Sequence, residues 1–259
     1  MSEQRDRHAF VSGATSGIGR AVAERLAGEG ARVFICARDA DAVAGTIKEL
    51  RDAGGDVDGA PCDVRDAGQV RSVVEEANAA GRVNVLVNNV GRGGGGQTAE
   101  IPDELWDDVI ATNLTSVFRV TRAFLASGLK DAGWGRVINI ASTAGKQGVV
   151  LGAPYSASKH GVVGFTKALG LELAKSGVTV NAVCPGYVET PMAENIRRGY
   201  ADYWDVTEGE VLARFEAKIP LGRYTTPEEV AAMVAYLAGP DTGAVTAQAI
   251  NVCGGLGNF

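Results

Sequence analysis

The feature of this sequence that most constrains its fold is a repeated alternation between two kinds of segment. Short runs rich in β-branched residues are followed by longer amphipathic runs. The short runs are almost continuously apolar, which is typical of strands covered on both faces. This order predicts a parallel sheet with right-handed crossovers and helices on both faces. The predicted strands are residues 8–12, 32–37, 58–62, 83–88, 136–140, 179–183 and 249–252, and the predicted helices are residues 18–28, 41–53, 67–80, 102–129, 155–176 and 227–237.

Length and composition suit a single domain. The chain has 259 residues, of which 46% are hydrophobic and 22% charged, so it can bury one sizeable core. No linker or shift in composition marks a boundary. We therefore expect one domain over residues 1–259.

One segment, residues 187–224, breaks the alternation. It lies between the sixth predicted strand and the last predicted helix, and it carries aromatic residues among charges. An insertion there would lie over the carboxyl ends of the strands, where open α/β sheets bind ligands. We expect a helical substrate lid, and the alternative is an ordinary helical excursion. The aromatic residues are Tyr200, Tyr203, Trp204 and Phe215.

Charge and composition argue against several classes of protein. A net charge of −6 does not suit a nucleic-acid surface, and no apolar run approaches the roughly 20 residues of a membrane span. The first seven residues are polar and lack a signal-peptide core, which predicts a cytoplasmic protein. With only His8 and His160, neither a metal site nor a histidine-centred triad is expected. The four cysteines are expected to be buried thiols rather than disulfides. They are Cys36, Cys62, Cys184 and Cys253.

A glycine-rich turn follows the first predicted strand and opens the first predicted helix. Gly13 permits a tight turn, Gly17 lets the backbone approach a pyrophosphate, and Gly19 allows close helix–strand packing. The helix N-terminus then offers free N–H groups to phosphate. This context predicts a dinucleotide site and a Rossmann-type fold: a single-domain, doubly wound α/β sheet of seven parallel strands.

The end of the second predicted strand indicates which dinucleotide is bound. A carboxylate at this position would bind the ribose 2′-hydroxyl of NAD and repel a 2′-phosphate. The sequence instead has Ala37 and Arg38, and a guanidinium suits a 2′-phosphate, so NADPH is favoured. Asp39 is the complication, because a shift of one residue would reverse the argument. Asp63, Asn88 and Asn89 also end strands, where they could contact the cofactor or simply form turns.

Four polar residues form a candidate catalytic set. Tyr155 and Lys159 are four apart on a predicted helix and so share one face. A nearby ammonium is expected to lower the pKa of the phenol, which would then donate a proton to a ketone more readily. Ser142, just past the fifth strand, could orient the same carbonyl. Asn113 lies mid-helix, where its propensity is poor and a polar role is plausible. Each could alone be surface decoration, a cap or a solvent-facing residue.

Together these motifs resemble those of the short-chain dehydrogenase/reductases over essentially the whole chain. The resemblance rests on Thr-Ser-Gly-Ile-Gly after Ala14, Asn88-Asn89-Val-Gly91, Asn113, Ser142, Tyr155-Ser-Ala-Ser-Lys159 and Pro185-Gly186. It implies that Tyr155 is the acid/base, that Lys159 lowers its pKa and holds the nicotinamide ribose, and that Ser142 orients substrate. Asn113 would hold a water in a proton relay. The implied cofactor contacts, with those predicted above, are Gly13, Thr15, Ser16, Gly17, Ile18, Gly19, Arg38, Asp63, Val64, Asn89, Gly91, Tyr155, Lys159, Pro185, Gly186, Val188 and Thr190.

The chain departs from that family's pattern at two positions. Val90 stands where Ala is usual, which implies a modest shift near the cofactor. Ser16 stands where a basic residue often precedes the second glycine, so the preference for NADPH rests on Arg38 alone.

A second resemblance is to type II aromatic polyketide ketoreductases. It rests on Gly145-Lys-Gln-Gly-Val-Val, Pro154-Tyr-Ser-Ala-Ser-Lys-His-Gly, Asn181-Ala-Val-Cys-Pro-Gly, Glu189-Thr-Pro-Met and Asn251-Val-Cys-Gly-Gly-Leu-Gly-Asn. It implies NADPH-dependent reduction of one ketone of a polyketide thioester on acyl carrier protein. One alternative is a β-ketoacyl-acyl carrier protein reductase of fatty acid synthesis, and another is a catalytically silent NADP-binding regulator.

The same resemblance implies a substrate site and an assembly. Gly94, Gly95 and Gly96 lie where such enzymes carry a Pro/Gly motif, so with Ser142 and Tyr155 they are predicted to bind substrate, in a loop more mobile than one containing proline. Basic residues at loop positions could accept the carrier protein or its phosphopantetheine phosphate, or be ordinary surface charges. They are Arg38, Arg65 and Arg92. A homotetramer is also implied, and an apolar stripe on helix 155–176 would contribute to its interfaces or to the core. The stripe is Val162, Phe165, Leu169 and Leu173.

Overall fold

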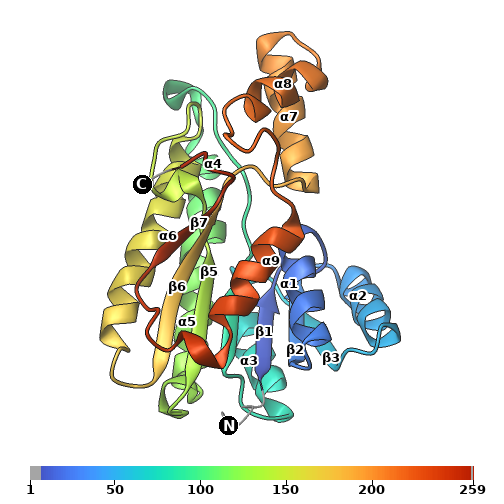
Figure 1. Cartoon of the computed structure of the whole chain (residues 1–259), viewed down its shortest axis with the longest axis vertical. Coiled ribbons are helices and arrows are strands. Elements are labelled where there is room, and N and C mark those ends of the chain that lie inside the picture. The colour runs from blue at the N-terminus through green and yellow to red at the C-terminus, as the bar shows by residue number, and fades with distance from the viewer. Residues whose placement is uncertain (1–6, 258) are drawn as a thin grey trace.

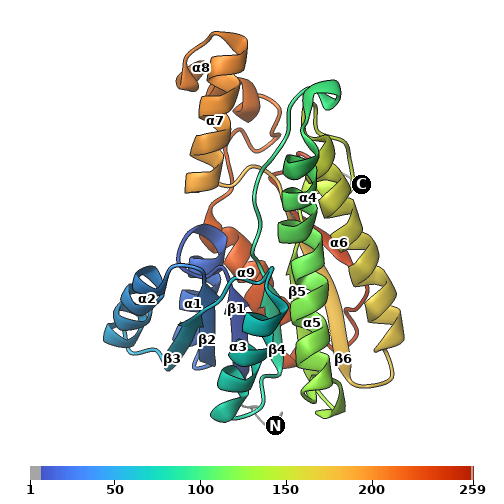
Figure 2. The same cartoon turned by 180° about the vertical axis from the view of Figure 1, so that it is seen from behind.

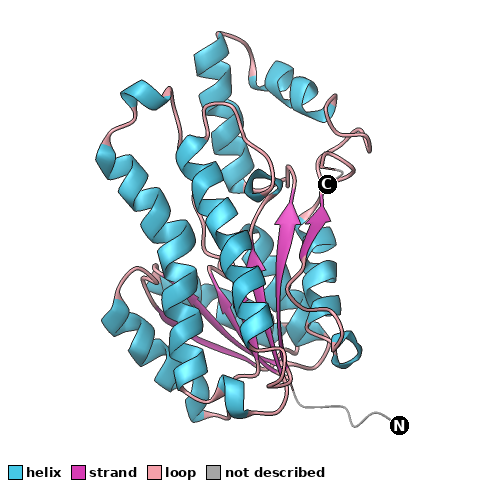
Figure 3. Cartoon of the chain, turned by 90° about the vertical axis from the view of Figure 1, so that its left-hand side faces the viewer, coloured by secondary structure: helices cyan, strands magenta, loops and turns pink. Residues whose placement is uncertain are grey.

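The computed structural model describes residues 7–257 and residue 259. Residues 1–6 of the polar N-terminal stretch and residue 258, the last of the 251–258 motif, lie outside the described residues. The centre of the fold is a sheet of seven parallel strands in the order β3-β2-β1-β4-β5-β6-β7 (Figures 1 and 3). The predicted architecture is confirmed. The strands are β1 (His8–Ser12), β2 (Arg32–Ala37), β3 (Val57–Pro61), β4 (Val85–Asn88), β5 (Gly135–Ile140), β6 (Val178–Pro185) and β7 (Ala249–Val252).

The sheet has a hydrophobic core on each face. On β2, Val33 and Ile35 pack toward one layer of helices, and Phe34 and Cys36 pack toward the other. This double burial explains why the strands are almost continuously apolar. Helices α1 (Gly17–Gly28), α2 (Ala40–Asp52) and α9 (Pro227–Leu237) cover the first face (Figure 1). Helices α3 (Ala67–Ala79), α5 (Ser116–Ala126) and α6 (Ala153–Glu172) cover the second (Figure 2).

The helix predicted over residues 102–129 is interrupted. It consists of α4 (Asp103–Ile110), a π-helical turn at Ala111–Thr115 and α5. Asn113 lies in that turn, and π turns inside helices are often found at functional sites. The helix ends three residues early because Gly128 adopts a left-handed backbone, with φ of 103°. Strand β6 runs two residues beyond the predicted end because β7 pairs with it as far as Pro185.

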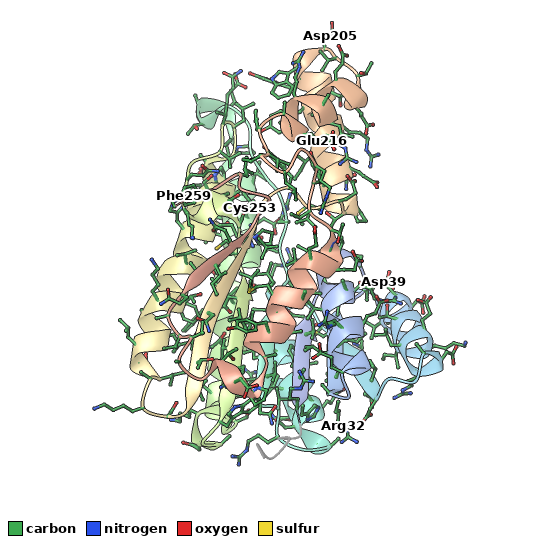
Figure 4. The ribbon with its side chains drawn as sticks, in the orientation of Figure 1. Arg32, Asp39, Asp205, Glu216, Cys253 and Phe259 are labelled. Atoms are coloured by element: carbon green, nitrogen blue, oxygen red, sulfur yellow. The ribbon has the colours of Figure 1, made fainter. Side chains whose placement is uncertain are left out.

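The lid segment, residues 187–224, is helical as predicted. Helices α7 (Pro191–Trp204) and α8 (Glu208–Glu216) lie above the carboxyl ends of the strands (Figures 1 and 2). They enclose a small hydrophobic cluster of their own, in which the Tyr187 and Phe215 rings stack at 4.7 Å. Asp205, between the two helices, lies at the far tip of the lid (Figure 4). The chain enters the lid near Val188 and leaves it near Thr225, and we call these two connections its stalks. A parallel β-bridge between Val188 and Thr225 joins them.

Several expectations about composition can be compared with the described residues. All four cysteines are free and buried there, as predicted. In the same residues, no group of metal-binding side chains occurs, and no helix has the length and apolar character that crossing a membrane requires. The stripe on α6 lies largely inside the protomer, because Val162, Leu169 and Leu173 are buried in its core.

Candidate functional site

A cavity of about 910 Å³ lies at the carboxyl ends of the strands, below α7. Its position follows from the strand order. After β1 the chain continues to one side of the sheet and after β4 to the other, so a crevice is left between the loops that follow these two strands. Most of the predicted site residues line it. They are Gly13, Thr15, Ser16, Gly17, Ile18, Arg38, Asp63, Val64, Asn89, Gly91, Ser142, Tyr155, Lys159, Pro185, Gly186, Val188 and Thr190.

The glycine turn forms one end of the cavity. Gly13 and Gly17 have φ of 66° and 52°, which L side chains rarely adopt. A Cβ on Gly19 would lie 2.2 Å from the Gly13 carbonyl oxygen, so only glycine allows α1 this close to β1. Asn89 supports the turn, because its Nδ2 donates to the carbonyls of Ser12 and Gly13 at 3.0 Å.

The N-terminus of α1 opens into the same end of the cavity. Ser16, its N-cap, makes no side-chain cap hydrogen bond, and the first turn contains no acidic residue. The N–H groups of that turn and the positive end of the helix dipole therefore favour an anion. The cradle of glycine backbone and helix N-terminus fits a dinucleotide pyrophosphate.

The structure shows a different local role for Asp39 than for Arg38. Asp39 caps α2, where its carboxylate accepts from the Ala42 N–H at 2.9 Å. Its carboxylate is therefore engaged at the start of the helix, although Asp39 and Arg38 both line the cavity. Arg32 and Asp39 flank the two ends of β2 in Figure 4. Arg38 carries the positive charge that a ribose 2′-phosphate requires, and its recognition of that phosphate stays a prediction.

Tyr155, Lys159 and Ser142 meet at the other end of the cavity. Tyr155 and Lys159 lie one turn apart near the start of α6, and the Lys159 Nζ lies 5.8 Å from the centre of the Tyr155 ring. Lys159 donates to the Ile140 carbonyl at 2.8 Å. Ser142 lies two residues past the end of β5, and its side chain hydrogen-bonds Tyr155. The predicted catalytic triplet is therefore brought together.

The effect on the tyrosine differs from the expected one. Burial raises the pKa of Tyr155, and the hydrogen bond with Ser142 only partly opposes that rise. Burial also lowers the pKa of Lys159 to about 8. The net shift in the pKa of Tyr155 is therefore upward, because removal from water outweighs the interactions that favour the phenolate. The contribution of Lys159 to that pKa stays a prediction. Tyr155 is instead kept protonated, which is the form that a proton donor requires.

Asn113 and the glycine run behave differently from the other predicted residues. The Asn113 side chain is fully buried, accepts from the Arg92 N–H at 2.8 Å and donates to the Arg92 carbonyl and to the Ser158 hydroxyl. It ties the π turn to the loop after β4, and its role in a proton relay stays a prediction.

The run at residues 93–96 does not line the cavity. A Cβ on Gly95 would lie 1.9 Å from the Leu151 carbonyl oxygen, and one on Gly94 would lie 2.5 Å from Val109 Cγ2. Gly94 and Gly95 therefore lie close to α4 and to the Leu151 carbonyl. The expectation of a more mobile loop stays a prediction. The assignment of Gly94, Gly95 and Gly96 to substrate binding stays a prediction.

Some residues that line the cavity were not singled out from the sequence. Asp108 comes from α4, Thr112 comes from the π turn that follows it, and Ala193 and Ile196 come from α7. Nothing marks them in the sequence, since Asp108 is one of several acids in its helix and Ile196 lies in a lid of unspecified conformation. Arg65 and Arg92 line the cavity with Arg38, but both form ion pairs with Asp108 rather than standing free.

Comparisons with known proteins agree with this geometry. The model of the short chain dehydrogenase family matches residues 7–201. A Streptomyces violaceoruber protein assigned as ketoacyl reductase 1 of the granaticin polyketide synthase is 63% identical over 97% of this chain and 93% of its own. The 3-oxoacyl-acyl-carrier-protein reductase FabG of Escherichia coli (strain K12) is 38% identical over 96% of each. The crystal structure of a point variant of actinorhodin polyketide ketoreductase with NADPH is 60% identical, with a TM-score of 0.96 and complete coverage of both chains.

The first prediction concerns the glycine turn. Gly19→Ala places a methyl group 2.2 Å from the Gly13 carbonyl oxygen and 2.3 Å from Asn89 Nδ2, so the turn must open. We expect NADPH affinity to fall at least about tenfold, the equivalent of roughly 1.4 kcal/mol, in a fluorescence titration. Gly28→Ala is the matched control, because it lies in the same helix with no atom within 4 Å of the added Cβ. Equal affinities of the two variants would contradict the steric argument.

The second prediction concerns cofactor choice. Arg38→Ala removes the guanidinium at the end of β2, and hydrogen bonds to charged groups contribute about 1.5–3 kcal/mol. The KM for NADPH should rise about 10- to 100-fold while the KM for NADH changes little, as measured by steady-state kinetics with each cofactor. Arg32→Ala, at the opposite end of the same strand, serves as control. A parallel loss with both cofactors would show that Arg38 does not read the 2′-phosphate.

The third prediction concerns pH. Lys159 carries its charge below its pKa of about 8, and its ammonium favours the phenolate that forms when Tyr155 gives up its proton. The raised pKa of Tyr155 keeps the donor protonated over the same range. With saturating substrates, kcat for ketone reduction should be constant at lower pH and fall as pH rises through about 8. A profile that rises with pH would require a different proton donor.

Proposed function

The chain belongs to the short-chain dehydrogenase family, and on this basis we propose that it is an NADPH-dependent ketoreductase that reduces one ketone of a carrier-protein-bound aromatic polyketide intermediate to a secondary alcohol. The observation that carries the proposal is a half-buried Tyr155, kept protonated and hydrogen-bonded to Ser142 beside Lys159, in a cavity whose other end fits a dinucleotide. The high similarity to polyketide ketoreductases supports the substrate class.

The residues at the dinucleotide end are suited to hold NADPH. The glycine turn and the N-terminus of α1 would bind the pyrophosphate, Arg38 the 2′-phosphate, and Asp63, Val64 and the Pro185–Thr190 segment the remaining surface. When bound, the reduced nicotinamide supplies a hydride. The role of the protein at this end is therefore to bind and to orient.

The catalytic residues act on the oxygen of the ketone. Ser142 Oγ orients the carbonyl through a hydrogen bond, and the Tyr155 hydroxyl gives its proton to the same oxygen as negative charge develops there. Lys159 lies close enough to stabilise the resulting phenolate. Asn113 keeps the Gly91–Arg92 backbone in place beside Lys159, since a Cβ on Gly91 would lie 3.5 Å from both Asn113 Oδ1 and Lys159 Nζ.

The lid supports a bulky substrate. Met192, Ala193 and Ile196 from α7, with Tyr187, give the cavity an apolar side above the catalytic residues. A linear acyl chain does not require a lid with its own aromatic cluster. This feature, with 63% identity to a polyketide synthase relative against 38% to FabG, favours polyketide reduction over the fatty-acid alternative.

Two partners complete the proposal. Arg38, Arg65 and Arg92 line the cavity and are suited to the acidic carrier protein or the phosphate of its arm. We also propose a homotetramer, in which the exposed Phe118 of α5 and Leu171 of α6 are covered by other subunits.

The fourth prediction tests the substrate class. The apolar cavity should reduce a bicyclic ketone such as a decalone with a kcat/KM at least about tenfold above that of a short acetoacetyl thioester, because more apolar area is buried. The measurement is NADPH oxidation at 340 nm, with Tyr155→Phe as the inactive control, expected to lose at least about 100-fold. A clear preference for the acetoacetyl thioester would favour the β-ketoacyl reductase alternative.

A further inference from the structure

Asp108 on α4 holds two arginines that come from different loops. Arg65 Nη1 donates to Asp108 Oδ1 at 2.7 Å, and Arg92 Nη1 donates to Asp108 Oδ2. All three side chains line the cavity. Without Asp108 the two guanidinium groups would face one another without a shared carboxylate. The arrangement has the form of a two-arginine anion site in which a side chain of the protein supplies the anion.

These ion pairs are weak enough to be exchanged. The side chains of Asp108, Arg65 and Arg92 are 28%, 38% and 43% exposed, so solvent screens the charges. Arg65 has a second carboxylate in Asp63, which keeps the guanidinium in place if Asp108 leaves. Arg92 is held through its backbone by Asn113. An incoming anion could therefore replace Asp108 without dismantling the loops that carry the arginines.

The arginine pair extends from the cofactor end of the cavity toward the catalytic end. Arg65 is paired with Asp63, whose pKa is lowered by Arg65 and also by Arg38 at the end of β2. Arg92 directly follows Gly91, whose backbone is next to Lys159 Nζ, so Arg92 reaches the catalytic end. A phosphate on a thioester-linked arm would come from the substrate side of the cavity, where Arg92 and Asp108 lie.

We propose that Asp108 is a specificity-determining residue: it is an internal counterion that occupies Arg65 and Arg92 until the phosphate of a phosphopantetheine arm displaces it. This inference rests on the proposed function and adds to it a residue that sets how strongly the carrier-borne phosphate is recognised. The carrier-borne phosphate is a diester with one negative charge and two non-bridging oxygens, so it can accept from both arginines as the carboxylate of Asp108 does and must compete with that carboxylate. Asp108 thereby limits the affinity for the arm.

The test uses two thioesters that differ by one phosphate. The quantity measured is the kcat/KM of acetoacetyl-phosphopantetheine divided by that of acetoacetyl-pantetheine, at saturating NADPH. Taking this ratio cancels any effect of a substitution on the chemical step, because that step is the same for both thioesters. Asp108→Asn should raise the ratio about three- to tenfold, because it removes the negative charge that competes for the two arginines. Asp107→Asn is the matched control, because Asp107 is the neighbouring acid on α4, is exposed and does not line the cavity.

Two further measurements identify the groups involved. Arg92→Gln added to Asp108→Asn should return the ratio to the wild-type value or below it. In the unmodified enzyme the ratio should exceed one and fall toward one as salt is raised from about 0.05 M to about 0.5 M. The salt measurement needs no variant, so it holds even if Asp108→Asn is poorly folded.

The contrary outcomes are distinct. A ratio for Asp108→Asn that is unchanged within twofold, or lower than wild type, would mean that Asp108 does not compete with the phosphate. A change in the preference for NADPH over NADH, in place of a change in the thioester ratio, would assign the arginine pair to the cofactor and overturn the inference. If the wild-type enzyme reduced neither thioester nor a decalone, the proposed function would fall as well. If it reduced both thioesters with equal efficiency at low salt, only the present inference would fall.

Discussion

The contact on which the rest of the site depends joins the ends of β1 and β4. The Asn89 amide donates to the carbonyls of Ser12 and Gly13, and the Asn89 N–H donates to the Ser12 hydroxyl at 3.0 Å. These strands are neighbours at the point where the order of the sheet reverses. The contact holds the glycine turn in the shape that lets α1 approach β1, and it sets the direction of the chain that continues to Gly91 and Arg92. Cofactor end and catalytic end are thus linked through one side chain.

Burial has two opposite consequences for the catalytic pair. It disfavours charge on both groups, so it raises the pKa of Tyr155 and lowers that of Lys159. For a reductase both effects matter, because the tyrosine must hold its proton until the ketone oxygen takes it. The Lys159 ammonium must stay charged in a site where burial disfavours charge. It donates a hydrogen bond to the Ile140 carbonyl, which gives it a fixed acceptor. The environment of the helix face, rather than the spacing of four residues alone, is what suits Tyr155 to the proton donation proposed for it.

The lid and the sheet are organised around separate cores. The residues of α7 and α8 bury their aromatic side chains against one another and against Tyr187 and Tyr224, whereas the two faces of the sheet bury theirs against the main helices. The lid is connected through two stalks that pair at Val188 and Thr225. The lid nevertheless reaches the dinucleotide end of the cavity, because Val188 and Thr190 line it and Thr190 lies against Gly17 of the glycine turn.

The sequence by itself determined the features that follow local rules. Continuous apolar runs predicted buried parallel strands, Gly13, Gly17 and Gly19 predicted the turn, and the Tyr155–Lys159 spacing predicted a shared helix face. Only the tertiary structure decided that Asp39 caps α2, that a π turn holds Asn113, and that Asp108 joins Arg65 to Arg92. It also decided the direction in which the pKa of Tyr155 moves. The physical reason is that capping, ion pairing and desolvation depend on groups distant in sequence, whose distances and exposure no local pattern contains.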